Sequence, residues 1–397
     1  MQLYILNSAY EIIGLVDEAD SVLYIKKYND VGECTIRVLC EEAYIDLLKA
    51  GNRVYRYDDD MFCKIVTPEI ETDTEQGDYF TVTAKDFINI LSGRIIWDNF
   101  TYSGTFGGFW KKVLTENVIN SNQPVRNIPR FTLDLESLNS ITDEITYSTK
   151  SDDILQLLIK SCKTYNIGFR LSYNINAQQL VFRLYRGKNK ASTQSEEYIE
   201  FSPTFANIFS SHYKEDESNH KTFAVVGAKD SDESLMYITV YEGEKEPTGE
   251  ERKEFYIDAT NQSRDITVEE LLLMFPTATL NSKGTAYSIT ISGIPIDVAT
   301  VDGDNAGDKV KVTDFTFQKM LEIIGLNGLA EHRKTQEFTG EVDTVDTYGY
   351  KTDYNLGDIV KVANNYGIEA EAQITEIWES EDSESGYTVE PKYEYFS

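Results

Sequence analysis

Residues 51–82 read GNRVYRYDDDMFCKIVTPEIETDTEQGDYFTV, and the pattern of this stretch returns in residues 357–389. Both stretches open with a glycine and a valine three positions later, pass through a turn into a long strand, and end with a glycine turn and a return strand. Matched residues lie 306 to 309 positions apart. Chance gives some such matches, because strands draw on few residue types. The shared order of turns and strands nevertheless predicts a duplicated β-barrel.

The sequence around the first stretch reads as strands. Residues 21–28 and 33–40 flank Asn29-Asp30-Val31-Gly32, which is typical of a hairpin turn. A short helix is expected near residues 42–49. Residues 20–95 are therefore expected to form a small barrel or sandwich.

The middle of the chain mixes helices and strands. Ser151 is a good N-cap for a helix with Asp153 in its first turn, and the apolar residues that follow have helical spacing. A longer helix is expected from about Asp314 to His332.

We predict a mainly β protein with α+β insertions, made of two similar small tube-type β-barrel domains and two smaller mixed domains. The expected ranges are 1–95 for the first barrel, 96–200 for an α+β decorating domain, 201–255 with 336–397 for a second, split barrel, and 256–335 for a mixed α/β insertion.

Composition and charge narrow the classes of function. Of 397 residues, 41% are hydrophobic, which suffices for ordinary cores, and 67 acidic against 37 basic residues give a net charge of −30. Such a surface gains nothing from counterion release on nucleic acid, and an anionic membrane repels it. A protein past which DNA must slide would benefit from the same repulsion.

The cysteines and the N-terminus indicate where the protein is made. The four cysteines, Cys34, Cys40, Cys63 and Cys162, form no CxxC pair and read as small buried hydrophobes in a reducing compartment. The N-terminus lacks the basic region of a signal peptide, and no apolar run is long enough to span a membrane. We expect assembly in the cytoplasm and no membrane insertion.

Sequence motifs of catalysis and cofactor binding are missing. The chain has no phosphate-binding GxxxxGKS/T, no GxGxxG after a strand, no HExxH and no GxSxG. His212 and His220 flank an acidic loop, where a metal pair is conceivable but exposed turn histidines are commoner. Abundant carboxylates make any glycosidase-like pair uninformative. We expect no enzyme activity and no cofactor.

One loop is a weak candidate for a metal site. The sequence Asp302-Gly303-Asp304-Asn305-Ala306-Gly307-Asp308 begins like a calcium loop, with Asp302, Asp304 and Asp308 as candidate ligands. The pattern then fails, because Ala306 takes the fifth position and Thr313 the twelfth, which needs a bidentate carboxylate. A polar turn is the better interpretation. The acidic run at 379–384 is interpreted as a solvated hairpin tip.

Two blocks of sequence carry a family resemblance. The first is residues 20–36 followed by 48–54, and the second is residues 348–360 followed by 374–377. Both resemble the tail-tip proteins of siphophages, which are related to the baseplate hubs of contractile-tailed phages. Arg126-Asn127-Ile128-Pro129, the helix after Ser151 and Ile167-Gly168-Phe169 agree with it, so that the resemblance covers nearly the whole chain.

The resemblance implies a structural protein of a phage or prophage virion. It implies a homotrimer whose two barrels per subunit build a pseudo-sixfold ring at the tail tip, through which DNA passes without binding. The implied partners are a distal tail or tail-tube protein, the tape-measure protein and a receptor-binding or fibre protein.

Many relatives continue into a cell-wall hydrolase or a fibre, whereas this sequence ends at Phe396-Ser397 after the second barrel. We therefore expect wall digestion and receptor binding to belong to other proteins. The rival interpretations are a carbohydrate-active enzyme and a carbohydrate-binding surface protein. A hydrolase screen with a solution mass discriminates among the three.

Overall fold

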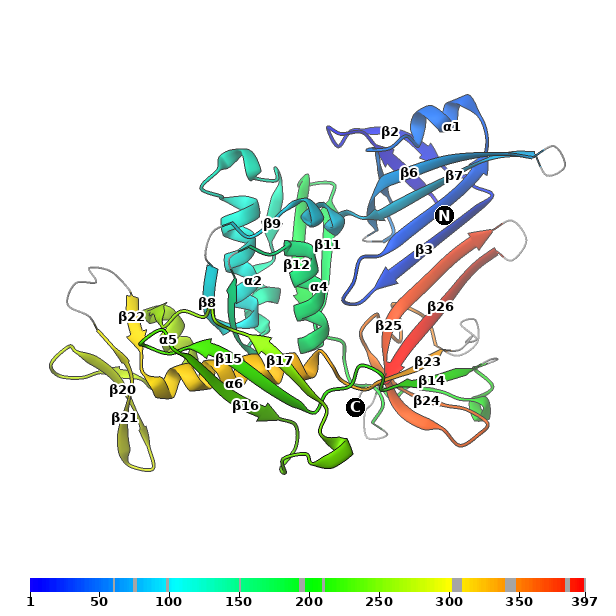
Figure 1. The fold of residues 1–397 in the computed structure, drawn as a ribbon. Coiled ribbons are helices and arrows are strands. Elements are labelled where there is room, and N and C mark those ends of the chain that lie inside the picture. Colours follow the sequence, from blue (N-terminus) through cyan, green and yellow to red (C-terminus); the bar gives the residue numbers. More distant parts are fainter. Residues whose placement is uncertain are drawn as a thin grey trace.

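We describe the fold from a computed structural model, in which the described residues are 1–59, 61–73, 77–97, 100–149, 151–192, 197–208, 211–301, 309–339, 348–382 and 386–395. The protein is mainly β with α+β insertions, as the sequence predicts. A 13-stranded sheet joins strands from the N-terminal and C-terminal parts of the chain. The blue and red strands of Figure 1 lie side by side in this sheet.

The first strand unit contains the seven N-terminal strands of this sheet. They are β1 (Leu3–Leu6), β2 (Ile12–Val16), β3 (Ser21–Lys27), β4 (Glu33–Leu39), β5 (Arg53–Tyr55), β6 (Phe62–Asp73) and β7 (Gly77–Asp86), with helix α1 (Glu42–Leu47) between β4 and β5. Their spatial order is β2-β1-β5-β6-β7-β4-β3. Alternate side chains of β3 and β4 are buried, because successive side chains of a strand point to opposite faces. Tyr24, Ile36 and Val82 belong to the core that results.

The second strand unit contains the other six strands of the sheet. They are β13 (Glu200–Phe201), β14 (His212–Asp216), β23 (Thr335–Thr339), β24 (Ile359–Ala363), β25 (Glu369–Asp382) and β26 (Gly386–Tyr395), and the 3-10 helix η4 (Pro203–Phe205) follows β13. Their spatial order is β14-β23-β26-β25-β24-β13. Phe201, Val360 and Tyr393 lie fully buried in the core of this unit.

The two strand units share one strand order. In the first unit the order is β3-β4-β7-β6-β5, and in the second it is β14-β23-β26-β25-β24, so the strands correspond one to one in chain sequence as well as in space. The large difference is an insertion: the link between β3 and β4 is residues 28–32, whereas the link between β14 and β23 is residues 217–334.

The two strand units also share their register. Gly51 and Gly357 have φ of 93° and 94°, a region that glycine adopts without strain. Their N–H groups donate to the carbonyls of Ile65 (2.9 Å) and Ile374 (2.8 Å). The pairing of β6 with β7 shifts between Ile65 and Thr67, and that of β25 with β26 shifts 309 positions later, after Ile374. The recurrence in sequence thus corresponds to a recurrence in strand order and register.

An α+β part connects the two units. It contains the 3-10 helices η1 (Phe87–Gly93) and η3 (Pro124–Arg126), the π-helix η2 (Thr115–Ile119), helices α2 (Phe106–Leu114), α3 (Leu135–Ser140) and α4 (Ile154–Tyr165), and strands β8 (Phe100–Thr105), β9 (Phe131–Leu133), β10 (Glu144–Thr149), β11 (Gly168–Asn174) and β12 (Gln179–Tyr185). Two small sheets, β10-β8 and β11-β12-β9, pack with the helices around Trp110 and Leu158. The N-cap of α4 is Asp153 and not Ser151: the Asp153 carboxylate accepts from the Gln156 N–H at 2.8 Å, while the Ser151 N–H donates to Thr149.

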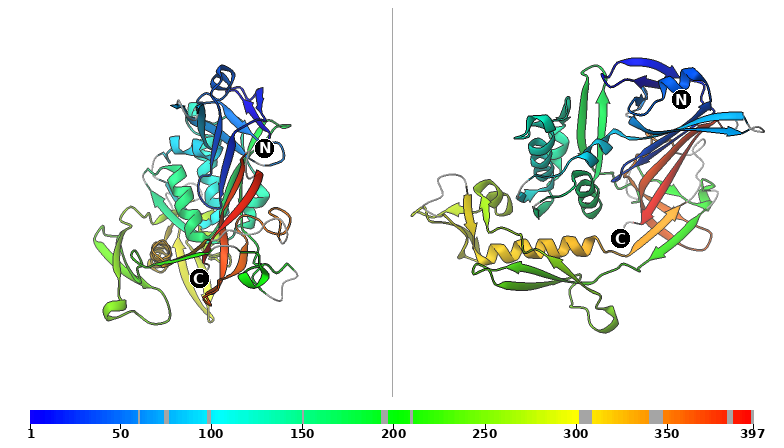
Figure 2. Two further views of the ribbon diagram at one scale, coloured as in Figure 1. Left: turned by 90° about the vertical axis from the view of Figure 1, so that its right-hand side faces the viewer. Right: turned by 45° about the horizontal axis from the view of Figure 1, so that its top comes forward.

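The insertion forms a separate mixed part. Its elements are β15 (Phe223–Lys229), β16 (Leu235–Tyr241), η5 (Gly249–Glu251), β17 (Glu254–Asp258), β18 (Asp265–Thr267), α5 (Val268–Met274), β19 (Thr279–Leu280), β20 (Ala286–Ile291), β21 (Ile294–Thr300), β22 (Lys309–Val312) and α6 (Asp314–Ala330). They make a sheet β16-β15-β17 and a sheet β18-β22-β21-β20-β19. Helix α6 lies along the first of these sheets (Figures 1 and 2).

This arrangement corrects the expected boundary between the second barrel and the insertion. We predicted residues 201–255 as part of the barrel, but β15, β16 and the start of β17 pair only with one another among the described strands. Gly325 of α6 packs against Val226 and Val240, where a side chain at Gly325 would collide with Val240. The close approach of helix and sheet places these strands in the insertion.

The helices of the described chain are too short or too polar to cross a membrane.

Candidate functional site at the joint between the two strand units

The two strand units meet along a joint formed by β3 and β25. These strands pair antiparallel from Ser21 opposite Asp382 to Lys27 opposite Glu376, and the Tyr28 N–H donates to the Thr375 carbonyl at 2.9 Å. In Figure 1 the blue β3 runs beside the red β25. The joint is therefore a continuous ladder of backbone hydrogen bonds, and not only a packing contact between two domains.

A cluster of buried charges lies on this joint. The side chains of Lys26, Asp59 and Glu379 are fully buried, and Lys26 forms ion pairs with both carboxylates. Arg56 Nη1 lies 2.6 Å from Glu379 Oε2, and Lys351 Nζ lies 2.9 Å from Asp59 Oδ2. We call these five residues the joint cluster. It draws on β3, on the segment after β5, on β25 and on the segment before β24.

The edge of the joint cluster is also saturated with partners. Burial lowers the pKa of Arg56, but hydrogen bonds to Asp58 and Glu379 outweigh it, so the pKa lies above its ordinary value. The Arg56–Asp58 bond measures 2.7 Å, and it holds the pKa of Asp58 below the ordinary range. The Tyr387 hydroxyl donates to Glu379 at 2.9 Å. Lys26 and Arg56 are the buried cations and Asp59 and Glu379 the buried carboxylates, so the buried charges balance, while Lys351 and Asp58 are partly exposed.

The joint cluster specifies how the two units align. A buried ion pair repays its desolvation only when its geometry is good, and it leaves an uncompensated buried charge when a partner is removed. A slip of β3 by one residue would turn Lys26 to the opposite face of the sheet. The cluster therefore fixes one register of β3 against β25.

A second buried polar group ties the first unit to the α+β part. Tyr24 donates to Asp86 at 2.7 Å, and Arg170 of β11 lies 3.6 Å from Asp86 and donates to the Tyr24 hydroxyl at 3.3 Å. Burial raises the pKa of Tyr24. Asp86 also accepts from the Gly32 N–H at 3.1 Å, so one carboxylate holds β7, the β3–β4 turn and β11 together.

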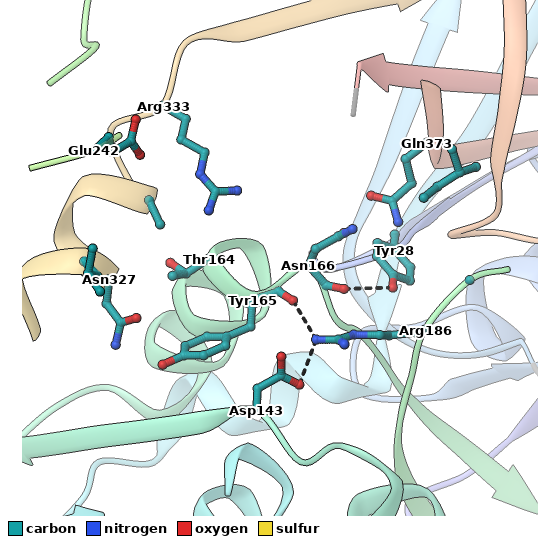
Figure 3. Close-up of a pocket in the computed structure, with 14 residues that line it drawn as sticks. Tyr28, Asp143, Thr164, Tyr165, Asn166, Arg186, Glu242, Asn327, Arg333 and Gln373 are labelled. Carbon is teal, nitrogen blue, oxygen red and sulfur yellow. Dashed lines mark hydrogen bonds and ion pairs between the residues drawn. The ribbon is translucent and has the colours of Figure 1, made fainter. Parts of the chain in front are cut away.

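A polar cavity of about 550 Å³ opens where the two units and α6 approach the end of α4. Figure 3 shows Arg186 between Asp143 and the Tyr165 carbonyl, at 2.8 and 3.2 Å. Tyr28 reaches across to the Asn166 carbonyl at 3.2 Å. Among the described residues that line the cavity there is no serine, cysteine or histidine, and Asp143 forms an ion pair with Arg186. The contacts of Arg186 and Tyr28 in this cavity connect separate parts of the fold.

The structure describes only some of the residues that the sequence suggested as metal ligands. Asp302, Asp304 and Asp308 lie outside the described residues. His212 is exposed on β14, and His220 lies in the turn that follows, with its N–H on the Glu217 carbonyl at 3.1 Å. Over the described ranges no group of three or more His, Cys, Asp or Glu residues is placed to hold a metal ion.

The cysteines follow the interpretation as small hydrophobes in three of four cases. Cys34, Cys63 and Cys162 are buried and free, whereas Cys40 is half-buried. Burial raises the pKa of the three buried thiols. They are accordingly packing residues and not reactive thiols.

The acidic run at 379–384 is not simply a solvated tip, which corrects the sequence interpretation. Glu379 is fully buried in the joint cluster, and Glu381 forms an ion pair with the N-terminal amine of Met1. The sequence held a signal for this: Lys26 falls in phase with the inward-facing Val22 and Tyr24 of β3, where a charge requires a buried partner.

Comparisons with known proteins agree with the family resemblance. A family model described as Siphovirus ReqiPepy6 Gp37-like protein matches residues 2–393. No curated protein matches the chain by sequence.

Solved structures show the fold. The tail protein from Neisseria meningitidis MC58 has a TM-score of 0.52 at 10% identity, over 99% of this chain and 95% of that one. Prophage tail protein gp18 from Listeria monocytogenes EGD-e has a TM-score of 0.52 at 13% identity, over 99% and 94%. At these identities the likeness shows a shared fold, which extends over the whole chain.

Proposed function

Because the chain belongs to the Siphovirus ReqiPepy6 Gp37-like family, a family of phage tail proteins, we propose that it is a structural hub subunit at the tip of the tail. The observation that carries the proposal is the pair of strand units with one strand order, joined edge to edge within the chain. Such a chain is a two-unit segment of a ring.

The proposed assembly is a homotrimer. Three chains with two similar units each make a ring with pseudo-sixfold symmetry, which can dock on a sixfold tail tube and present threefold symmetry on its other side. Ring closure requires a heterologous contact, in which one face of a subunit meets a different face of the next. The proposed neighbours are a distal tail or tail-tube protein, the tape-measure protein and a receptor-binding or fibre protein.

The charge of the chain supports a role as a conduit for DNA. A net charge of −30 spreads acidic side chains over the surface, including the wall of a central channel. Carboxylates there repel phosphates, so that DNA passes without binding. We propose a virion tail location, with assembly in the host cytoplasm and no catalytic activity.

Mass measurement of intact tails tests the proposal. We expect three copies of the chain per tail tip, and a ring in a low-resolution image viewed along the tail axis. A copy number other than three, or a channel lined by lysine and arginine, would contradict it. A turnover on peptidoglycan or host polysaccharide that disappears when one or two carboxylates are mutated would contradict the structural role.

A further inference from the structure

The correspondence between the units reveals an edge that has no partner strand among the described residues. In the second unit, residues 376–382 of β25 pair with β26 on one side and with β3 on the other. In the first unit, residues 67–73 of β6 correspond to them, and within the described chain they pair with β7 alone. We call residues 67–73 the open edge.

Burial shows the same difference. In the second unit, Ile377 and Glu379 are buried between β26 and β3. Their counterparts on the open edge, Pro68 and Ile70, are exposed, with Ile70 49% accessible. An exposed apolar residue on an unpaired strand edge is a site for pairing with another chain.

The complementary strand is β14. It corresponds to β3 in strand order, and it is the last strand of the sheet at the other end of the path from the first unit. The shared register aligns Lys214 with Ile25 and His212 with Leu23, because Glu337 and Thr339 of β23 correspond to Glu33 and Thr35 of β4. Strand β14 therefore relates to the second unit as β3 relates to the first.

We infer that β14 of one copy of this chain adds to the open edge of the next copy, in the register that joins β3 to β25 within the chain. This inference rests on the proposed ring and assigns its contact between subunits. Ile25 opposite Trp378 then maps to Lys214 opposite Glu69, Leu23 opposite Ser380 maps to His212 opposite Glu71, and Tyr24 opposite Glu379 maps to Tyr213 opposite Ile70.

The chemistry of the two edges fits this register. Lys214 and His212 are exposed on β14, and they meet the exposed Glu69 and Glu71. Tyr213 meets Ile70 on the opposite face, which is the face that carries buried side chains at the joint within the chain. Cross-strand pairs of opposite charge, here Lys214 with Glu69, and aromatic–aliphatic pairs, here Tyr213 with Ile70, both stabilise antiparallel strands.

Two prolines show toward which neighbouring strand the N–H groups of β25 and β6 point. Pro391 has no N–H, so its pair with Ile377 is not hydrogen-bonded, and the Ile377 N–H points to β3. Pro68 faces Val82 in the same way, so its ring nitrogen points out of the open edge. The proposed joint between copies, formed by β14 and the open edge, thus lacks one backbone N–H donor that the joint between β3 and β25 has. It is therefore the weaker of the two.

Lys214 and Glu69 fall in a non-hydrogen-bonded pair, in which Cα atoms lie about 4.5 Å apart, within the range that a disulfide spans. We would mix Lys214→Cys protein with Glu69→Cys protein under oxidising conditions, both in a Cys40→Ser background because Cys40 is the cysteine that is not buried. The matched control replaces Glu69→Cys by Ile70→Cys, whose side chain points to the other face of β6.

We expect a covalent dimer that is about tenfold more abundant in the Lys214→Cys and Glu69→Cys mixture than in the control, since disulfide geometry is restrictive. Equal yields in the two mixtures would overturn the inference. So would intact tails that hold three copies of the double variant without a disulfide between residues 214 and 69, and that result would leave the proposed function standing. A specific crosslink in tails with another copy number would keep the strand pairing and refute the proposed trimer.

Discussion

Replacement of Glu379→Gln tests whether the joint cluster holds the two strand units together. The substitution keeps the size of the side chain and removes its charge, while Lys26 and Arg56 stay buried beside it. Breaking a buried ion pair by neutralising one partner costs about 3–5 kcal/mol. Lys26 retains Asp59 and Arg56 retains Asp58, so we expect the lower end, about 3 kcal/mol.

Hydrogen exchange measured peptide by peptide is the suitable assay, because it reports the opening of individual elements. A loss of 3 kcal/mol at the joint corresponds to about a hundredfold faster exchange of the amides of β3 and β25. The matched control is Glu322→Gln on α6, whose partner Lys319 lies 2.6 Å away with both side chains about half exposed. Exposed pairs contribute about 0–1 kcal/mol, so this variant should exchange as the parent does.

The reasoning fails if the joint amides of Glu379→Gln exchange no faster than those of Glu322→Gln. A second variant guards against a trivial loss of fold. Adding Lys26→Met to Glu379→Gln removes the stranded cation along with its partner, and the double variant should lose less stability than the sum of the two single changes. Strict additivity would show that the two residues do not interact.

Three further predictions concern stability. The low pKa of Asp58 contributes stability above the ordinary aspartate range and loses it as pH falls through the folded pKa, so Asp58→Asn should flatten the acid limb of a stability–pH curve below about pH 4. Gly357→Ala should destabilise more than Gly51→Ala in urea, because φ is alike but only a side chain at 357 would collide with Tyr28. Asp153→Ala should cost about 1 kcal/mol in the same assay and Ser151→Ala much less.

Local signals in the sequence predicted local structure well. The hairpin of β3 and β4 and the helical spacing of α4 could be predicted from neighbouring residues alone, and the structure has these elements. The N-cap of α4 was predicted wrongly, since Ser151 and Asp153 are both good caps and the choice depends on the turn at Thr149.

The remaining features of the fold depend on which strands pair across long stretches of sequence, and local patterns do not show this pairing. Strand β14 reads HYKED and is largely exposed, whereas β15 reads FAVVGAK and is largely buried. Composition does not name the partner of a strand, however: β14 joins the large sheet and β15 packs on α6. The sequence therefore did not show where to divide residues 201–255. In the same way, the position of Lys26 among the inward-facing residues of β3 indicates a buried charge. It does not identify the partner, Glu379, which lies far along the chain.

The open edge is exposed in the free subunit, where it must not pair at random, and it would be paired in the proposed assembly. A bare strand edge invites aggregation, and charged side chains or a proline on the edge oppose it. Glu69 and Glu71 repel other acidic chains, and Pro68 interrupts the row of outward donors. The two glutamates would also meet Lys214 and His212 in the proposed contact, so the charges that prevent random pairing would select the correct strand.

The two joints therefore combine one geometry with different chemistry. The joint within the chain forms once, during folding, and its buried ions fix a permanent register. The proposed joint between copies has Ile70 where β25 has Glu379, and Glu215 where β3 has Lys26, so it has no buried ion cluster. Exposed charge pairs and one missing donor make that contact weak in isolation. Closure of the proposed ring, in which each subunit would be held by two such contacts, would supply the stability that a single contact lacks.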